Sequence, residues 1–219
     1  MLELGLKILA SYLLGAVNGS LLIGRLRGGI DIRKLGSGNA GATNALRTQG
    51  IWFALPAIAI DFCKGLIPVM LFPTLMLPGV GLDPAVDREW LAVACGAAAV
   101  VGHCYPLWHG FAGGKGAATM AGVLFAMAPN MLLIVVIIWA VVLLLTGYVG
   151  LATMTAGLSL PIAVAISGDA QFSDPFFVLT IVAAAFIIFT HRINISRLRD
   201  GTEQAIGPIT RLGRRKPNQ

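Results

Sequence analysis

Two glycine-rich stretches carry most of the polar side chains that could do chemistry in an otherwise apolar chain. The first, GSGNAGATNALR at residues 36–47, combines three glycines with hydroxyl and amide side chains and ends on Arg47. Glycines let successive backbone N–H groups curl around an anion, and an arginine can grip a phosphate with two parallel hydrogen bonds. A glycine-rich turn that only caps a helix needs neither this length nor the arginine. The stretch is therefore interpreted as a phosphate cradle.

The second stretch, GHCYPLWHGFAGGKGAAT at residues 102–119, is similar to a nucleotide-binding loop but fails the Walker pattern. His109 stands where GxxxxGK[ST] needs a glycine, and Gly116 follows the lysine where Ser or Thr should hold magnesium. What remains is a glycine loop with Lys115 at the start of a helix, which predicts a second anion site. Taken alone, Lys115 could be a boundary lysine and His103 an ordinary interface histidine. Beside three other polar stretches, the anion site is favoured.

The third stretch, DFCK, lies within a long apolar run. Asp61 and Lys64 are three residues apart on one helical face, so the two charges can pair inside a membrane. A purely structural ion pair and a part in the site both fit this spacing.

The fourth stretch, HRINISRLRDGTE, ends the last apolar run. His191 and Asn194 are three residues apart and share a helical face. A basic stop-transfer tail would explain the arginines of this stretch, but it would not explain this pair or Glu203. His191 and Asn194 are therefore predicted to belong to the site.

Several chemistries are disfavoured by what the chain lacks. Metal-dependent phosphotransfer needs several carboxylates for divalent ions, and the four stretches contain no carboxylate cluster. The HxxxxD signature of many acyltransferases is missing, because the residues five positions after the three histidines are Trp108, Gly114 and Ser196. The site is expected to work without metal, without a cofactor and without a His–Asp dyad. The cysteines are interpreted as small packing residues: Cys63, Cys95 and Cys104.

Composition defines the elements that must hold these stretches. Of the 219 residues, 57% are hydrophobic and 12% are charged, whereas soluble domains carry about a quarter charged residues. The chain is predicted to be an all-α integral membrane protein with one domain over residues 1–219. Seven apolar runs are candidate spans: Leu4–Ile23, Ile51–Leu77, Trp90–Val101, Gly116–Ala128, Met131–Leu145, Leu151–Ile166 and Phe176–Thr190. If Gly116–Ala128 and one neighbour were re-entrant, five crossings would fit equally well.

Charge predicts the sidedness of the bundle. Five Lys and Arg lie in residues 25–47, Lys115 lies in the second glycine stretch, and seven lie between Arg192 and Lys216. The connectors at 83–89 and 169–174 are acidic instead. By the positive-inside rule the N-terminus lies outside, and residues 199–219 form a basic cytoplasmic tail. All four polar stretches then lie at or near the cytoplasmic face, and the positive net charge reflects orientation and not nucleic-acid binding.

In this order and spacing, the four stretches resemble the bacterial PlsY family of acyl-phosphate:glycerol-3-phosphate acyltransferases. The resemblance implies a seven-helix enzyme of the bacterial cytoplasmic (inner) membrane that acylates the sn-1 hydroxyl of glycerol 3-phosphate with acyl phosphate. The products of this reaction would be lysophosphatidic acid and inorganic phosphate, and the reaction would be the first acylation of phospholipid synthesis. The resemblance also implies no metal and no acyl-CoA or carrier-protein donor. The partners would be the two substrates, membrane lipid and the enzyme that makes acyl phosphate.

The resemblance also assigns residues. The predicted catalytic residues are Ser37, Arg47, Lys115, His191 and Asn194. The predicted substrate-binding residues are Gly36, Gly38, Asn39, Thr43, Asn44, Lys64, His103, Gly113, Gly114 and Thr153. Arg47 and Lys115 would stabilise the developing charge, while His191 and Asn194 would position the glycerol. The hydroxyl proton would pass to His191 or to the phosphate of the substrate, and the resemblance favours the phosphate.

Two positions depart from the family pattern. Asn18 stands in GAVNGS where the family usually has proline, so this helix end is expected to differ. At 150–153 this chain has GLAT where the family often has Ser-Leu-x-Ser, so only Thr153 supplies a hydroxyl there.

Two rival functions were weighed against the acyltransferase. An anion transporter would need charged residues along a path across the membrane, and the polar stretches gather near one face. An intramembrane serine protease built on Ser37 lacks a supporting signature.

Overall fold

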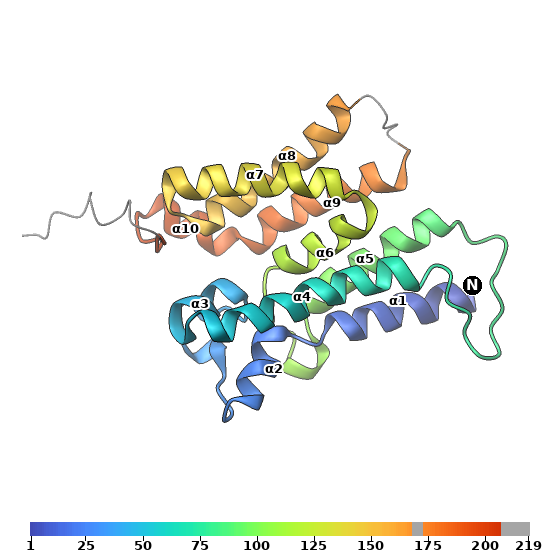
Figure 1. Cartoon of the computed structure of the whole chain (residues 1–219), viewed down its shortest axis with the longest axis horizontal. Coiled ribbons are helices and arrows are strands. Elements are labelled where there is room, and N and C mark those ends of the chain that lie inside the picture. Colours follow the sequence, from blue (N-terminus) through green and yellow to red (C-terminus); the bar gives the residue numbers. More distant parts are fainter. Residues whose placement is uncertain (168–172, 207–219) are drawn as a thin grey trace, which may run out of the picture.

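The computed structural model of the chain describes residues 1–167 and 173–206, and this part is built from helices without a strand (Figure 1). The expected tail beyond residue 206 and most of the acidic connector at 169–174 lie outside the described residues. The α-helices are α1 Leu2–Gly15, α2 Gly19–Leu26, α3 Ala42–Gln49, α4 Ile51–Leu71, α5 Arg88–Cys104, α6 Ala117–Met127, α7 Pro129–Thr146, α8 Val149–Ile166, α9 Pro175–Thr190 and α10 Arg192–Arg199. Two 3₁₀ turns, Ile32–Lys34 and Leu107–His109, lie in the connections.

Each predicted apolar run corresponds to a helix, but not every run is a single long one. By length and composition, α4, α7, α8 and the segment Arg88–His109 can each cross a membrane. The bent pairs α1–α2 and α9–α10 raise the number of candidate spans to six within the described residues, and α6 is a shorter apolar helix. Seven full crossings and the orientation of the termini stay predictions.

The candidate span Leu4–Ile23 is not one continuous helix but a bent pair of helices. α1 ends at Gly15, α2 begins at Gly19, and the two helices meet at 50°. Asn18, at the position where the family usually has proline, caps α2: its Oδ1 accepts a hydrogen bond from the Leu21 amide at 3.1 Å. The second run also ends early, because α4 stops at Leu71 and Pro73 follows it.

Small residues bring the helices close together. A Cβ atom at Gly65 of α4 would lie 2.0 Å from the Thr119 carbonyl oxygen of α6. A Cβ at Gly15 of α1 would lie 2.2 Å from the Ala99 carbonyl oxygen of α5. The helices in each pair therefore pack backbone against backbone, which only glycine permits at these points.

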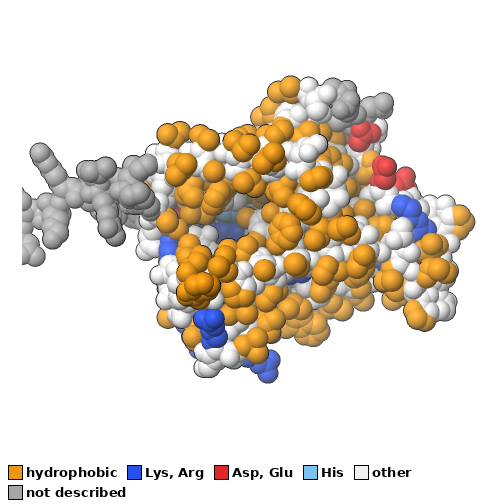
Figure 2. Space-filling view, viewed as in Figure 1, with side chains coloured by type: hydrophobic (Ala, Val, Ile, Leu, Met, Phe, Trp, Pro, Cys, Tyr) orange, Lys and Arg blue, Asp and Glu red, His pale blue; other side chains and the backbone are white. Residues whose placement is uncertain are grey.

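The bundle has two groups of helices joined by α6. In Figure 1, α7, α8 and α9 lie on one side and α1, α4 and α5 on the other, with α6 between them. The main core runs between the groups and contains Val100, Leu124 and Leu160. α7 buries none of its residues, so its outer face is left for lipid. The visible face is apolar over its middle (Figure 2).

Candidate active site

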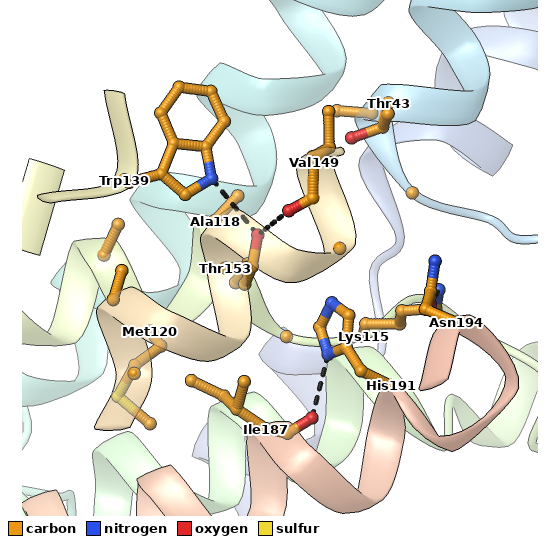
Figure 3. A pocket seen from close by; sticks show the side chains of 18 of the residues that line it. Thr43, Lys115, Ala118, Met120, Trp139, Val149, Thr153, Ile187, His191 and Asn194 are labelled. Carbon is orange, nitrogen blue, oxygen red and sulfur yellow. Dashed lines mark hydrogen bonds between the residues drawn. The ribbon is translucent and has the colours of Figure 1, made fainter. Parts of the chain in front are cut away.

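A cavity of about 560 Å³ lies between the two groups of helices and gathers most of the predicted site residues. Segments far apart in sequence contribute to it, as Figure 3 shows for Thr43, Lys115, His191 and Asn194. The predicted residues that line it are Ser37, Gly38, Asn39, Thr43, Asn44, Arg47, His103, Lys115, Thr153, His191 and Asn194. Four predicted residues do not line it: Gly36, Lys64, Gly113 and Gly114.

Asn44 holds the first glycine stretch in shape. Its Oδ1 accepts a hydrogen bond from the Ser37 amide at 2.9 Å, and its Nδ2 donates to the carbonyls of Ile32, Leu35 and Asn39. The side chain is 1% exposed and its hydrogen-bonding capacity is used inside the protein. Gly36 turns beside it with φ +55°, and a Cβ there would lie 2.3 Å from Asn44 Oδ1. In this geometry Asn44 and Gly36 shape the loop, while the side chains of Ser37, Asn39 and Thr43 are placed at the cavity.

Two amides of the second glycine stretch do not fit its interpretation as an anion site. Gly113 N donates to the Cys104 carbonyl and Gly114 N to the His103 carbonyl, each at 3.1 Å. These two amides therefore do not face an anion, and their residues lie behind the cavity. Ala117 and Ala118, in the first turn of α6, line the cavity instead, and a helix N-terminus favours negative charge.

Lys115 belongs to a chain of three side chains. Its Nζ donates to Asn194 Oδ1, and Asn194 Nδ2 donates to Glu203 Oε1 at 2.7 Å. Burial lowers the pKa of Lys115 to about 8, and the nearby cations Arg197 and Arg47 act in the same direction, while Glu203 opposes them. Glu203 is 7% exposed and supplies the counter-charge of this region.

Arg47 approaches the same region from α3. Its Nη2 donates to the Gln204 carbonyl at 2.6 Å, which leaves other guanidinium N–H groups for the cavity that Arg47 lines. Burial lowers the pKa of Arg47 from its usual value, with Glu203 opposing, and an arginine stays charged under such a shift. Arg47, Lys115 and Arg197 thus face one carboxylate, so this end of the cavity carries an excess of positive charge.

His191 sits at the break between α9 and α10. Its Nδ1 lies 2.8 Å from the Ile187 carbonyl (Figure 3), and the side chain is 4% exposed. A carbonyl oxygen can only accept, so Nδ1 carries the hydrogen of this bond. In the neutral ring Nε2 is then an acceptor, suited to a substrate hydroxyl.

The rest of the cavity is apolar and runs between α6, α7, α8 and α9. Thr153 is the residue where the polar and apolar parts meet: its Oγ1 donates to the Val149 carbonyl at 2.9 Å and accepts from Trp139 Nε1 at 3.2 Å (Figure 3). Its hydroxyl is therefore already engaged within the protein. The apolar walls include Met120, Leu124, Leu132, Val135, Leu160, Ala183 and Ile187. Sequence reasoning did not identify these walls, because their residues are indistinguishable from ordinary core residues.

The third polar stretch forms a buried network beside the cavity. Lys64 Nζ lies 2.8 Å from Asp61 Oδ1, and it also donates to the Val17 carbonyl. Asp61 Oδ1 lies 3.3 Å from His103 Nδ1, and both residues line the cavity. The structure thus brings a histidine and an aspartate together at the site, a contact that the sequence did not predict. The pair joins α4 to α5, so a local motif such as HxxxxD could not reveal it.

Three charged residues at the cavity were not among the predicted site residues. Glu203 and Arg197 belong to the fourth polar stretch, where the carboxylate was a usable signal because a basic tail does not explain it. Asp61 was paired with Lys64 but not placed at the cavity. Across residues 1–167 and 173–206, no three His, Cys, Asp or Glu side chains come together as a possible metal site.

The described residues form an all-helical bundle in which a cationic pocket continues into an apolar channel, and this fold defines an integral membrane protein. A family model described as Glycerol-3-phosphate acyltransferase matches residues 5–201, and the chain belongs to this family. The family resemblance drawn from the four polar stretches is confirmed.

Relatives with the same description extend over nearly the whole chain. The protein of Aquifex aeolicus is 37% identical over 196 residues, which cover 90% of this chain and 95% of that protein. The protein of Halalkalibacterium halodurans is 38% identical over 209 residues, which cover 94% of this chain and 97% of that protein. Both are glycerol-3-phosphate acyltransferases by name.

The solved structures similar to this fold are crystal structures of PlsY (YgiH), an integral membrane glycerol 3-phosphate acyltransferase. Its glycerol 3-phosphate form has a TM-score of 0.81 and 35% identity, and the match covers 96% of this chain and 99% of that one. Its lysophosphatidic acid form has a TM-score of 0.79 and 34% identity, with the same coverage. The prediction of an all-α integral membrane protein is confirmed.

Proposed function

We propose that this protein transfers an acyl group from acyl phosphate to the sn-1 hydroxyl of glycerol 3-phosphate, giving lysophosphatidic acid and inorganic phosphate. The observation that carries the proposal is the single cavity in which a cationic end, with Arg47 and Lys115, continues into an apolar channel. The cationic end suits two phosphate groups, and the channel suits one acyl chain. The forms of PlsY named for glycerol 3-phosphate and lysophosphatidic acid support the same substrate and product.

The dimensions of the channel support an acyl donor. The wall of α8 runs from Val149 to Leu160, which is about 16 Å at about 1.5 Å per residue. Carbon–carbon bonds of about 1.5 Å at near-tetrahedral angles advance about 1.25 Å each, so about 13 carbons of an extended chain would fit. Figure 2 shows a hollow in the apolar face with basic side chains inside it. A longer tail could therefore extend sideways into lipid.

The reaction needs alignment more than activation of a group. The sn-1 hydroxyl oxygen attacks the acyl carbonyl carbon, a carbon–oxygen bond forms, and the bond from that carbon to the phosphate oxygen breaks. Arg47 and Lys115 neutralise the charge that builds on the departing phosphate, and holding both substrates in one cavity makes the attack effectively intramolecular. The amides of Ala117 and Ala118 add further positive potential.

The hydroxyl proton passes to the phosphate that leaves, and His191 positions the glycerol. Nδ1 of His191 is held by the Ile187 carbonyl, so Nε2 accepts a hydrogen bond from the substrate hydroxyl. His191→Gln should keep measurable turnover, because a glutamine can still accept a hydrogen bond although it is no base. Complete loss of turnover, with glycerol 3-phosphate binding retained, would make His191 the obligatory base and overturn this assignment.

The proposed site faces the cytoplasm of a bacterial inner membrane. The positive-inside rule supports this, because Arg25, Arg33 and Lys34 lie just before the first glycine-rich stretch, which lines the cavity. Acyl phosphate is a reactive mixed anhydride, so the protein would work downstream of an enzyme that makes it. A phosphate or organic anion transporter is the alternative, and a channel suited to an acyl chain disfavours it.

The deciding assay uses purified protein with palmitoyl phosphate and glycerol 3-phosphate, with EDTA present throughout. Formation of lysophosphatidic acid and phosphate is expected, and palmitoyl-CoA should give none. Activity only with palmitoyl-CoA, or loss of activity in EDTA, would contradict the donor or the metal-free mechanism. In vesicles that contain the protein, flux of phosphate without product would support the transporter instead.

A further inference from the structure

We propose that Asp61 is a positioning residue for the reaction: it orients His103, and His103 supports the loop that presents Lys115 to the cavity. The inference rests on the proposed function, in which Lys115 binds a phosphate group of the substrates. It goes beyond that function by assigning a role to the buried charged side chains of α4. Contacts between α4, α5 and the loop before α6 connect Asp61 to Lys115.

Three nitrogen groups lie around one carboxylate oxygen of Asp61, and of these the Gly19 amide donates a hydrogen bond, whereas His103 Nδ1 lies close without one. Asp61 Oδ1 lies 2.8 Å from Lys64 Nζ and 3.3 Å from His103 Nδ1, and it accepts the Gly19 amide at 2.9 Å. Asp61 is 1% exposed, and Lys64 and His103 are also buried. Lys64 alone neutralises the carboxylate, so an ion pair that served only to stabilise the bundle would not need the histidine. Asp61 and His103 both line the cavity and Lys64 does not, so the contact between Asp61 and His103 is the part of the network that lies at the site.

His103 is the wall against which the glycine loop packs. A Cβ atom at Gly114 would lie 2.0 Å from His103 Nε2, so the loop lies directly against the ring. The His103 carbonyl also accepts the Gly114 amide at 3.1 Å, and the Cys104 carbonyl accepts the Gly113 amide. Backbone and ring of the same residue therefore fix the loop immediately before Lys115.

The orientation of the His103 ring determines the position of the glycine loop that packs against it. With Nδ1 turned to Asp61, the opposite edge of the imidazole carries Nε2 against Gly114. Without the carboxylate charge, the ring would lose the charged group that its Nδ1 edge faces. The loop could then shift, and Lys115 with it. Small displacements of a group that grips a substrate have large effects on rate.

The chain contains a matched control for the loss of a buried charge. Lys7 and Glu3 form an ion pair of 2.6 Å whose side chains are 1% and 2% exposed, against 2% and 1% for Lys64 and Asp61. Neither Lys7 nor Glu3 lines the cavity. Glu3→Gln and Asp61→Asn therefore make the same chemical change at equal burial, one away from the site and one beside it.

The experiment measures glycerol 3-phosphate binding by calorimetry, acyl transfer and thermal unfolding for the wild type and both variants. Both variants should lower the unfolding temperature. Asp61→Asn should in addition weaken binding by about ten- to hundredfold, the value of one charge-assisted hydrogen bond, while Glu3→Gln binds as the wild type does. In a Lys115→Ala background, Asp61→Asn should have little further effect on binding.

The positioning role would be overturned if Asp61→Asn and Glu3→Gln bound glycerol 3-phosphate equally well. It would also be overturned if Asp61→Asn weakened this binding as strongly in the Lys115→Ala background as in the wild type. If Asp61→Asn does not fold, Gly114→Ala tests the same contact from the loop side, because its Cβ must push against His103. That variant should also weaken binding, and unchanged binding would refute the proposal. Binding is independent of the acyl donor, so a wild type that binds glycerol 3-phosphate but does not use acyl phosphate would reject only the proposed reaction.

Discussion

The pH dependence of the reaction should report the charge on Lys115. Burial lowers the pKa of this lysine to about 8, with Arg197 and Arg47 acting in the same direction and Glu203 opposing. An ordinary lysine keeps its charge until about pH 10.4, so it would not titrate in the same range. Because the pKa of Lys115 is depressed, its ammonium group is present below about pH 8 and is lost as the pH rises through that value.

The size of the effect can be worked out from this pKa. About nine tenths of the protein carries the ammonium group one pH unit below the pKa, and about one tenth carries it one unit above. If only the charged form grips the phosphate, kcat/KM for glycerol 3-phosphate should fall about tenfold between about pH 7 and about pH 9. The ratio kcat/KM is the right quantity, since it reports the free enzyme.

Three variants separate Lys115 from other causes of a pH effect. In Lys115→Arg the guanidinium stays charged, so the fall should disappear even if the overall rate is lower. Glu203→Gln removes the carboxylate that raises this pKa, so the fall should move to lower pH. Lys34 is exposed and does not line the cavity, so Lys34→Gln serves as the control with an unchanged profile.

The assay follows lysophosphatidic acid at each pH, with the spontaneous hydrolysis of acyl phosphate subtracted from a sample without enzyme. A flat profile to about pH 9.5 would refute the requirement for the ammonium group. A fall of the same size and position in Lys115→Arg would assign the titration to another group.

The remaining predictions concern the loop, the channel and the helix break. Asn44→Ala removes four hydrogen bonds and should lower the free energy of unfolding by about 3 kcal/mol, measured by thermal or denaturant unfolding, and a change below about 1 kcal/mol would contradict its role in holding the loop. Ala183→Phe should fill the inner end of the channel and lower turnover of palmitoyl phosphate more than that of decanoyl phosphate; an equal loss for both would show that the chain lies elsewhere. Asn18→Ala should cost about 1 kcal/mol of stability by removing the cap of α2, whereas Asn18→Ser should retain most of it, and equal losses would show that the cap is not the cause.

The membrane class and the helices could be predicted because lipid imposes local requirements. A backbone in hydrocarbon must satisfy its own hydrogen bonds, so long apolar runs become helices whatever their neighbours are. The break at Asn18 was harder to predict, because the apolar pattern continues across it from Leu4 to Ile23. The cap is decided by a side chain that bonds the Leu21 amide, and hydropathy does not register such a bond.

The site was predictable in its membership and less so in its geometry. Ser37, Arg47, Lys115 and His191 were expected in one place because their stretches suit anions, and they do line one cavity. Their individual roles stay predictions. The amides at Gly113 and Gly114 were expected to face a phosphate, yet they bond to carbonyls at the end of α5. A glycine-rich sequence indicates that a loop can curl, but it does not indicate which acceptor the loop curls around.

By itself, the sequence determined that this is an α-helical membrane protein with two glycine-rich stretches and a small set of cations and histidines for its chemistry. These features depend on residue type and short spacing, which are fixed along the chain. Only the tertiary structure decided that Asp61 meets His103 and that Lys115 is linked through Asn194 to Glu203. Those contacts join residues on different helices and loops, and close packing at small residues sets their distances, so no local pattern could specify them.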